Sequence, residues 1–241
     1  MKQFSCMVEK HLVGQDGIPV LACYVPGGES GPLVFLQHGY TGCKEMDLQF
    51  GMRIAQEGYF VVLPDARLHG ERRPPDFQQI FESDFYNRFV DVIEGTVQDI
   101  TRLIDYFGRD EAGLAGISMG GFITFLAAVR EPRLKAVVPI IGSPKLLPGP
   151  DTPADQPGLD RFDVIPEAEK IRPKAVLVLN GMKDEIVRPD GVMQMDPVLR
   201  DLYRDIPERY ELVLFENVGH EVTEEMKQRT VDWFKKHLPV R

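Results

Sequence analysis

Residues 113–121 read GLAGISMGG and join a short apolar run to a segment with a helical pattern, residues 119–130. At that junction Gly116-x-Ser118-x-Gly120 has the spacing of a nucleophile elbow. In such an elbow a sharp strand-to-helix turn leaves a serine exposed above a sheet. Glycines two residues on either side let the two backbones pass without a Cβ clash. The alternative is an ordinary glycine-rich turn at a helix N-terminus, but the strand–turn–helix context favours the elbow.

Apolar runs recur on both sides of this elbow and alternate with amphipathic stretches. The strands are expected at residues 4–10, 19–25, 32–38, 59–64, 113–118, 134–141, 174–180 and 210–216, and the helices near 45–57, 87–107, 119–130, 189–204 and 221–238. The later strands are near-continuous runs of Val, Leu and Ile, which is typical of a parallel sheet buried on both faces. Only the turn Gly14–Gly17 separates the first two, so they should form an antiparallel hairpin at one edge. The pattern predicts an α/β fold with a mostly parallel eight-stranded sheet and helices on both faces.

Length and composition limit the classes of protein. The regular alternation favours a single domain over residues 1–241 rather than two. A net charge of −9 argues against binding to nucleic acid or to an anionic membrane. The three cysteines do not form a disulfide framework, and no continuous apolar stretch marks a signal peptide, so a cytoplasmic location is expected. Zinc-ligand spacings, a P-loop and a dinucleotide motif are missing, so neither a metal nor a cofactor is expected.

Two long connections interrupt the alternation. Residues 143–170 contain six prolines, which forbid a strand and break any long helix, so a short irregular cap is expected there. Residues 65–86 form the other connection. Both follow the carboxyl end of a predicted strand, which is the end where open α/β sheets bind ligands.

A serine nucleophile needs a base, and the base needs a carboxylate that fixes its tautomer. His220 lies directly after the last strand and before the last helix. Asp184 lies in the turn that follows the strand at 174–180, with Glu185 as the neighbouring alternative. The chain order Ser118, Asp184, His220 and the positions at strand ends favour one catalytic triad.

Acyl transfer also needs donors for the oxyanion. The backbone N–H of Met119, next to the serine, is one candidate, and that of Tyr40, in the loop after the third strand, is the other. The Tyr40 side chain could bind substrate through its hydroxyl or form a wall of the pocket. His38 is interpreted as a structural support of this loop rather than a second base.

Two further groups have alternative interpretations. Four phenylalanines recur every four residues, as a stripe on a helix that either belongs to the core or lines an acyl site: Phe77, Phe81, Phe85 and Phe89. Arg67 and its neighbours Arg72 and Arg73 either receive a substrate carboxylate or pair with acids such as Glu71 and Asp76.

These motifs together resemble the α/β-hydrolase superfamily over essentially the whole chain. Within it the chain is most similar to small bacterial esterases related to the prolyl-oligopeptidase-like and dienelactone-hydrolase branches, because residues 64–72 resemble their Asp-x-Arg-x-x-Gly loop. The resemblance implies hydrolysis of carboxylic esters without metal or cofactor. Ser118 departs from the dienelactone hydrolases, which carry cysteine at the elbow. A propeller domain is also missing, so a peptidase would lack its usual gate.

The sequence therefore predicts a carboxylesterase that hydrolyses short- to medium-chain acyl esters of small molecules. A thioesterase or an amidase/peptidase would use the same triad. The alternative from another class is a non-catalytic ligand-binding receptor on the same fold, since a fold does not fix a function.

Overall fold

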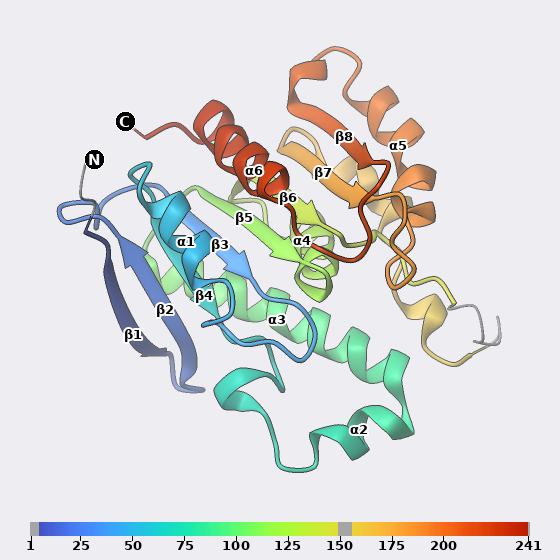
Figure 1. The fold of residues 1–241 in the computed structure, drawn as a ribbon, viewed down its shortest axis with the longest axis horizontal. Coiled ribbons are helices and arrows are strands. Elements are labelled where there is room, and N and C mark those ends of the chain that lie inside the picture. Colours follow the sequence, from blue (N-terminus) through green and yellow to red (C-terminus); the bar gives the residue numbers. More distant parts are fainter. Residues whose placement is uncertain (1–4, 149–155, 241) are drawn as a thin grey trace.

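The computed structural model describes residues 5–148 and 156–240. Eight strands form one sheet in the order β1-β2-β4-β3-β5-β6-β7-β8 (Figure 1). β2 pairs antiparallel with β1 and with β4, and the other neighbours are parallel. The strands are β1 Met7–Val13, β2 Ile18–Tyr24, β3 Leu33–Gln37, β4 Phe60–Pro64, β5 Ala112–Ile117, β6 Leu134–Ile140, β7 Ala175–Gly181 and β8 Tyr210–Phe215. The expected antiparallel edge hairpin and parallel remainder are confirmed.

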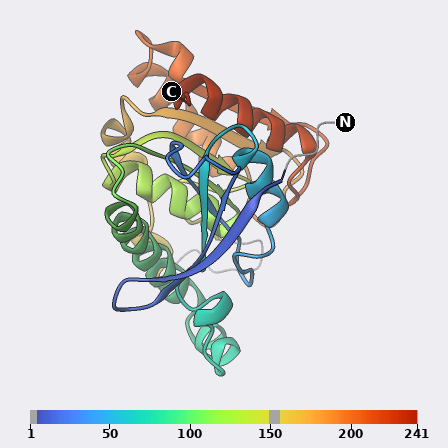
Figure 2. The same ribbon diagram turned by 90° about the vertical axis from the view of Figure 1, so that its left-hand side faces the viewer.

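Helices cover both faces of the sheet, as Figure 2 shows with the β1–β2 hairpin toward the viewer. They are α1 Leu48–Ala55, α2 Phe77–Ser83, α3 Phe85–Phe107, α4 Met119–Arg130, α5 Asp190–Leu202 and α6 Glu224–His237. α1 and α6 pack in the core on one face, while α3, α4 and α5 pack in the core on the other. The prediction of helices on both faces is thus confirmed.

The side chains of β3 point alternately to the two faces of the sheet and are buried on both. Leu33 and Phe35 enter one core, and Val34 and Leu36 enter the other. Each of these side chains is at most 1% exposed. Burying one such side chain contributes about 1.5–3 kcal/mol to folding. The central strands therefore form a firm base for the loops at their carboxyl ends.

Several element boundaries differ from the expectation by a few residues, and one helix is additional. The first strand runs from Met7 to Val13 instead of over 4–10, whose first residue lies outside the described part of the chain. Its end is set by the turn in which Gly17 N–H donates to Gly14 O at 3.2 Å, with both glycines at positive φ. Residues 65–86 hold the additional helix α2, separated from α3 by Asp84 at φ −162° and ψ 60°.

The cap segment 143–170 is described except for residues 149–155. Its described part contains two short 3₁₀ helices, η2 Leu159–Arg161 and η3 Ile165–Ile171, and an isolated antiparallel bridge between Lys145 and Asp163. This agrees with the effect expected of its prolines. Across the described residues, the structure has no helix that is both long and apolar enough to span a membrane.

Candidate active site

Ser118 lies at the turn from β5 into α4 with φ 54° and ψ −113°, a backbone conformation that few residues other than glycine adopt. The flanking glycines make this turn possible. A Cβ on Gly116 would lie 2.0 Å from Gly120 O, and a Cβ on Gly120 would lie 2.2 Å from Gln37 O. Ser118 N–H donates to Ile140 O at 2.9 Å, which ties the turn to β6. The local geometry is that of the predicted elbow.

The structure brings Ser118, His220 and Asp184 together. The Ser118 Oγ lies 2.9 Å from His220 Nε2, and His220 Nδ1 lies 2.8 Å from Asp184 Oδ2. The other carboxylate oxygen of Asp184 accepts the backbone N–H groups of Ile186 at 3.0 Å and Val187 at 2.8 Å. Asp184 is 2% exposed. These contacts fix the carboxylate and leave one oxygen for the imidazole.

Backbone hydrogen bonds join the two loops that carry Asp184 and His220. Met182 N–H donates to Phe215 O at 2.9 Å, and Lys183 N–H donates to Val218 O at 3.0 Å. Gly181 allows this approach, because a Cβ there would lie 2.2 Å from Val218 O. The turn after β7 and the loop after β8 therefore form one unit.

Glu185, the alternative acid, is exposed. It lines the cavity above Ser118 rather than forming the contact with His220, which Asp184 makes.

The loop after β3 lies beside the serine, since a Cβ on Gly39 would be 3.4 Å from Ser118 Cβ. Within residues 5–148 and 156–240, the backbone N–H groups of Tyr40 and Met119 donate no hydrogen bond. His38 supports this loop. Its Nε2 accepts the N–H of Ala66 at 3.0 Å, so its Nδ1 is the nitrogen that donates to Gly39 O at 2.8 Å. Burial lowers the pKa of His38, in keeping with a neutral ring whose two nitrogens are both occupied.

A cavity of about 210 Å³ opens at Ser118. We call it the catalytic cavity. Most of its walls are aromatic or aliphatic, and they include Tyr40, Phe85, Phe89, Phe122, Leu146 and Val187. Lys145, Glu185 and Arg188 add charge to the lining. Burial raises the pKa of Tyr40 although nearby Arg73 acts against it, so the phenol stays protonated near neutral pH.

The phenylalanine stripe divides between the core and the wall of the catalytic cavity. The Tyr40 ring lies 5.9, 5.1, 5.6 and 6.2 Å, between centroids, from Phe77, Phe81, Phe85 and Phe89. Phe77 and Phe81 are at most 4% exposed and belong to the core. Phe85 and Phe89 line the catalytic cavity. The stripe crosses the break at Asp84 and so lies on two helices rather than one.

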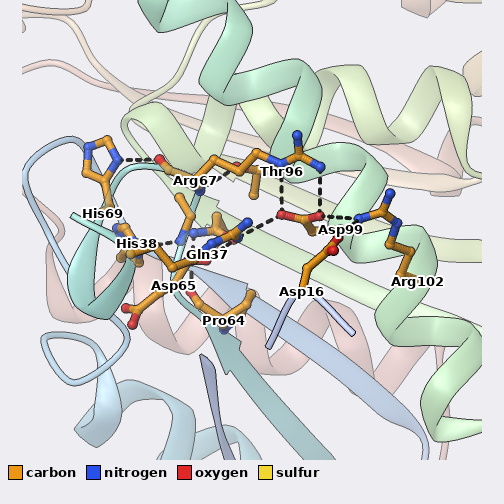
Figure 3. Close-up of polar contacts among 12 residues, drawn as sticks. Asp16, Gln37, His38, Pro64, Asp65, Arg67, His69, Thr96, Asp99 and Arg102 are labelled. Atoms are coloured by element: carbon orange, nitrogen blue, oxygen red, sulfur yellow. Dashed lines mark hydrogen bonds and ion pairs between the residues drawn. The ribbon is translucent and has the colours of Figure 1, made fainter. Parts of the chain in front are cut away.

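Arg67 does not line the catalytic cavity. Its Nε and Nη2 donate to the two carboxylate oxygens of Asp99 at 3.1 and 3.0 Å (Figure 3). Arg72 joins the same carboxylate at 2.7 Å. The pairing interpretation thus fits Arg67 better than a contact with substrate, although the acid is Asp99 rather than Glu71 or Asp76.

Sequence reasoning missed a buried ion pair behind the Tyr40 loop. Lys44 Nζ donates to Asp65 Oδ2 at 2.8 Å and also contacts Glu71, and Lys44 N–H donates to Asp65 Oδ1 at 2.8 Å. Burial acts to lower the pKa of Lys44, but hydrogen bonds to Asp65 and Glu71 outweigh it and raise that pKa. The lysine therefore stays charged and joins the loop after β3 to the loop after β4. The only signal in the sequence was the Asp-x-Arg-x-x-Gly loop that contains Asp65.

In the part of the chain that the structure describes, no group of three or more His, Cys, Asp or Glu side chains could hold a metal ion. The arrangement of Ser118, His220 and Asp184 suits nucleophilic acyl transfer by side chains alone.

Comparison with known proteins gives a consistent result. The model of the dienelactone hydrolase family matches residues 22–238. The chain is 27% identical over 232 residues to the putative esterase YitV of Bacillus subtilis, covering 86% of this chain and 89% of that protein. It is 25% identical over 247 residues to the esterase YjfP of Escherichia coli, with 92% and 96% covered.

Two solved structures have the same fold. TT1662 from Thermus thermophilus superposes with a TM-score of 0.76 at 23% identity, covering 98% of this chain and all of that one. A putative dienelactone hydrolase from Klebsiella pneumoniae gives 0.73 at 21% identity, with 97% and 100% covered. At this level of identity the likeness shows the α/β-hydrolase fold.

Proposed function

The chain belongs to the dienelactone hydrolase family, and on that premise we propose that it is a serine carboxylesterase with Ser118 as nucleophile, His220 as base and Asp184 as orienting acid. The family and the esterases among the relatives make the chain a hydrolase of carboxylic esters. The observation that carries the proposed residue roles is the continuous hydrogen-bonded chain from Ser118 Oγ through His220 to Asp184.

The reaction proceeds in two halves. Ser118 Oγ attacks the ester carbonyl while His220 Nε2 takes its proton, and Asp184 Oδ2 holds the Nδ1–H of the ring. The N–H groups of Met119 and Tyr40 bind the oxyanion that forms. The alcohol leaves with the proton from His220, and an acyl group remains on Ser118. Water then gives a proton to His220 and attacks the acyl carbon. The bond to Ser118 Oγ breaks, His220 returns the proton to that oxygen, and the acid is released.

The size of the catalytic cavity supports a preference for short- to medium-chain acyl groups, of about two to eight carbons. Its volume of about 210 Å³ is below the roughly 300–1,000 Å³ of sites for drug-sized ligands. We take residues 1–241 as one α/β-hydrolase domain in which 143–170 acts as a short cap. Leu146, Leu147 and Pro148 of that segment line the catalytic cavity and support this assignment.

Two measurements test the proposal. A phosphonylating serine reagent should label the protein once, on Ser118, by intact mass and peptide mapping, and Ser118→Ala should remove the label. Each methylene buried adds about 0.8 kcal/mol, so kcat/KM for p-nitrophenyl esters should rise about fourfold per carbon over the first few carbons. The rise should stop by about eight carbons, and chains that outgrow the cavity, such as the decanoate, should be hydrolysed more slowly than the butyrate.

The outcomes separate the alternatives. Labelling of another residue would contradict the assignment of the nucleophile. Labelling of Ser118 without turnover of any ester would favour a ligand-binding receptor. Faster turnover of matched thioesters or amides would assign the enzyme to a different class of hydrolase. A steady rise of kcat/KM with chain length up to palmitate would contradict the short acyl pocket.

A further inference from the structure

A second cavity lies directly behind one wall of the catalytic cavity. It has a volume of about 540 Å³, and Phe77 and Phe81 line it together with Arg73 and Gln78. Tyr40 and Phe85 are the only described residues that line both cavities. These two side chains therefore separate the catalytic cavity from the second cavity.

The wall between the cavities is made by ring contacts. The Phe85 ring meets Tyr40 edge-on at 5.6 Å with an interplanar angle of 79°, and it stacks on Phe89 at 5.5 Å and 18°. Phe81 lies 6.0 Å away on the other side. Edge-on and offset contacts between aromatic rings are favourable beyond the area that they bury. These ring contacts hold the apolar side chain of Phe85 in place.

Phe85 differs from the rest of the stripe in its exposure. It is 39% exposed, whereas Phe77, Phe81 and Phe89 are at most 6% exposed. It is also the first residue of α3, directly after the break at Asp84. Shortening this side chain should therefore disturb the core less than the same change at the other three positions.

We propose that Phe85 sets the upper limit of acyl length and that the second cavity is an acyl subsite which this ring closes. This inference rests on the proposed esterase activity. The group that the subsite would take is the far end of a linear, apolar acyl chain. Its aromatic side consists of Tyr40, Phe77, Phe81 and Phe85, while Thr41, Arg73, Gln78 and Glu82 complete the lining. The carboxyl carbon stays at Ser118, and only the distal methylenes pass the position of the removed ring.

The test is the ratio of kcat/KM for p-nitrophenyl decanoate to that for the butyrate, both below their micelle concentrations. In the wild type the decanoate should be at least tenfold poorer. Phe85→Ala should raise the ratio at least tenfold, through a lower KM for the decanoate. Phe85→Leu should raise it less, and provides a milder opening if the alanine variant does not fold.

Phe107→Leu is the matched control for Phe85→Leu. Both rings lie on α3, at its two ends, and Phe107 lines neither of the two cavities. The control should leave the decanoate ratio within about threefold of the wild type. In a crystal of Phe85→Ala, a decyl phosphonate bound to Ser118 should place its distal carbons in the space left by the ring, beside Tyr40 and Phe81.

An unchanged ratio in a folded Phe85 variant would overturn the inference, as would an equal gain in Phe107→Leu. A wild type that already hydrolyses the decanoate as well as the butyrate would overturn it too. If the wild type hydrolyses no ester at all, the proposed function itself fails. The two failures are thus distinguishable.

Discussion

Replacing Asp184 by asparagine should lower kcat by roughly 10⁴-fold while the fold survives. Asparagine has nearly the same shape, so the buried site can accept it. The Oδ1 of Asp184 accepts two backbone N–H groups, from Ile186 and Val187. An asparagine would keep its single carbonyl oxygen there and turn its NH₂ group toward His220 Nδ1.

The asparagine would thereby invert the tautomer of His220. Nδ1 would have to accept, so the proton would move to Nε2, which faces Ser118 Oγ at 2.9 Å. A protonated Nε2 cannot take the serine proton. A loss of 10⁴-fold corresponds to about 5.4 kcal/mol in the barrier, at 1.36 kcal/mol for each factor of ten.

The assay is kcat for p-nitrophenyl butyrate, with urea unfolding to check stability. Glu185→Gln is the matched control, because it makes the same chemical change at the exposed neighbouring position, and it should stay within about threefold of the wild type. A larger loss in Glu185→Gln than in Asp184→Asn would refute the tautomer argument and the choice of acid.

Three further predictions concern stability, measured by urea unfolding. Gly120→Ala should lower the free energy of unfolding by at least about 2 kcal/mol, because the added Cβ would lie 2.2 Å from Gln37 O. A loss below about 0.5 kcal/mol would mean that the elbow can relax around the added methyl group. Lys44→Met should lower the free energy of unfolding by about 3–5 kcal/mol, because it leaves the Asp65 carboxylate buried without its cation. The double variant Lys44→Met/Asp65→Asn should recover part of that loss, and no recovery would argue against the ion pair. Burial lowers the pKa of His69 to about 4. Between roughly pH 6.5 and pH 4 this histidine therefore binds a proton only in the unfolded chain, so the free energy of unfolding should decrease by up to roughly 3 kcal/mol as the pH falls through this window. His69→Phe should flatten that fall, and an unchanged slope would assign it to other groups.

Local patterns were enough to predict the sheet and the positions of Ser118, Asp184 and His220 at the ends of its strands. The elbow at Ser118 needs only glycines two residues away, and Asp184 and His220 each follow a strand that is visible as an apolar run. That these side chains come within hydrogen-bonding distance follows from parallel strands ending at one edge of the sheet.

Pairings between distant residues could not be predicted in the same way. The partner of Arg67 is Asp99, 32 positions along the chain on α3, and the partner of Lys44 is Asp65, 21 positions away. Charge and spacing do not choose among the many acids of a chain with net charge −9. The phenylalanine stripe indicated one helix over residues 77–89, but it gave no sign of the break at Asp84 that makes α2 a separate helix of seven residues.

The backbone hydrogen bonds that join the turn after β7 to the loop after β8 should couple the thermal motion of these two segments. Met182 and Lys183 tie the acid's turn to the loop of His220, while Ser118 belongs to a different part of the sheet. Thermal displacement should therefore carry Asp184 and His220 as a pair, and the Nδ1–Oδ2 contact should persist while the distance to Ser118 Oγ fluctuates. Nδ1 of the imidazole would keep its proton throughout the proposed catalytic cycle, so that Nε2 of the neutral ring is ready to accept a proton whenever the serine returns to it.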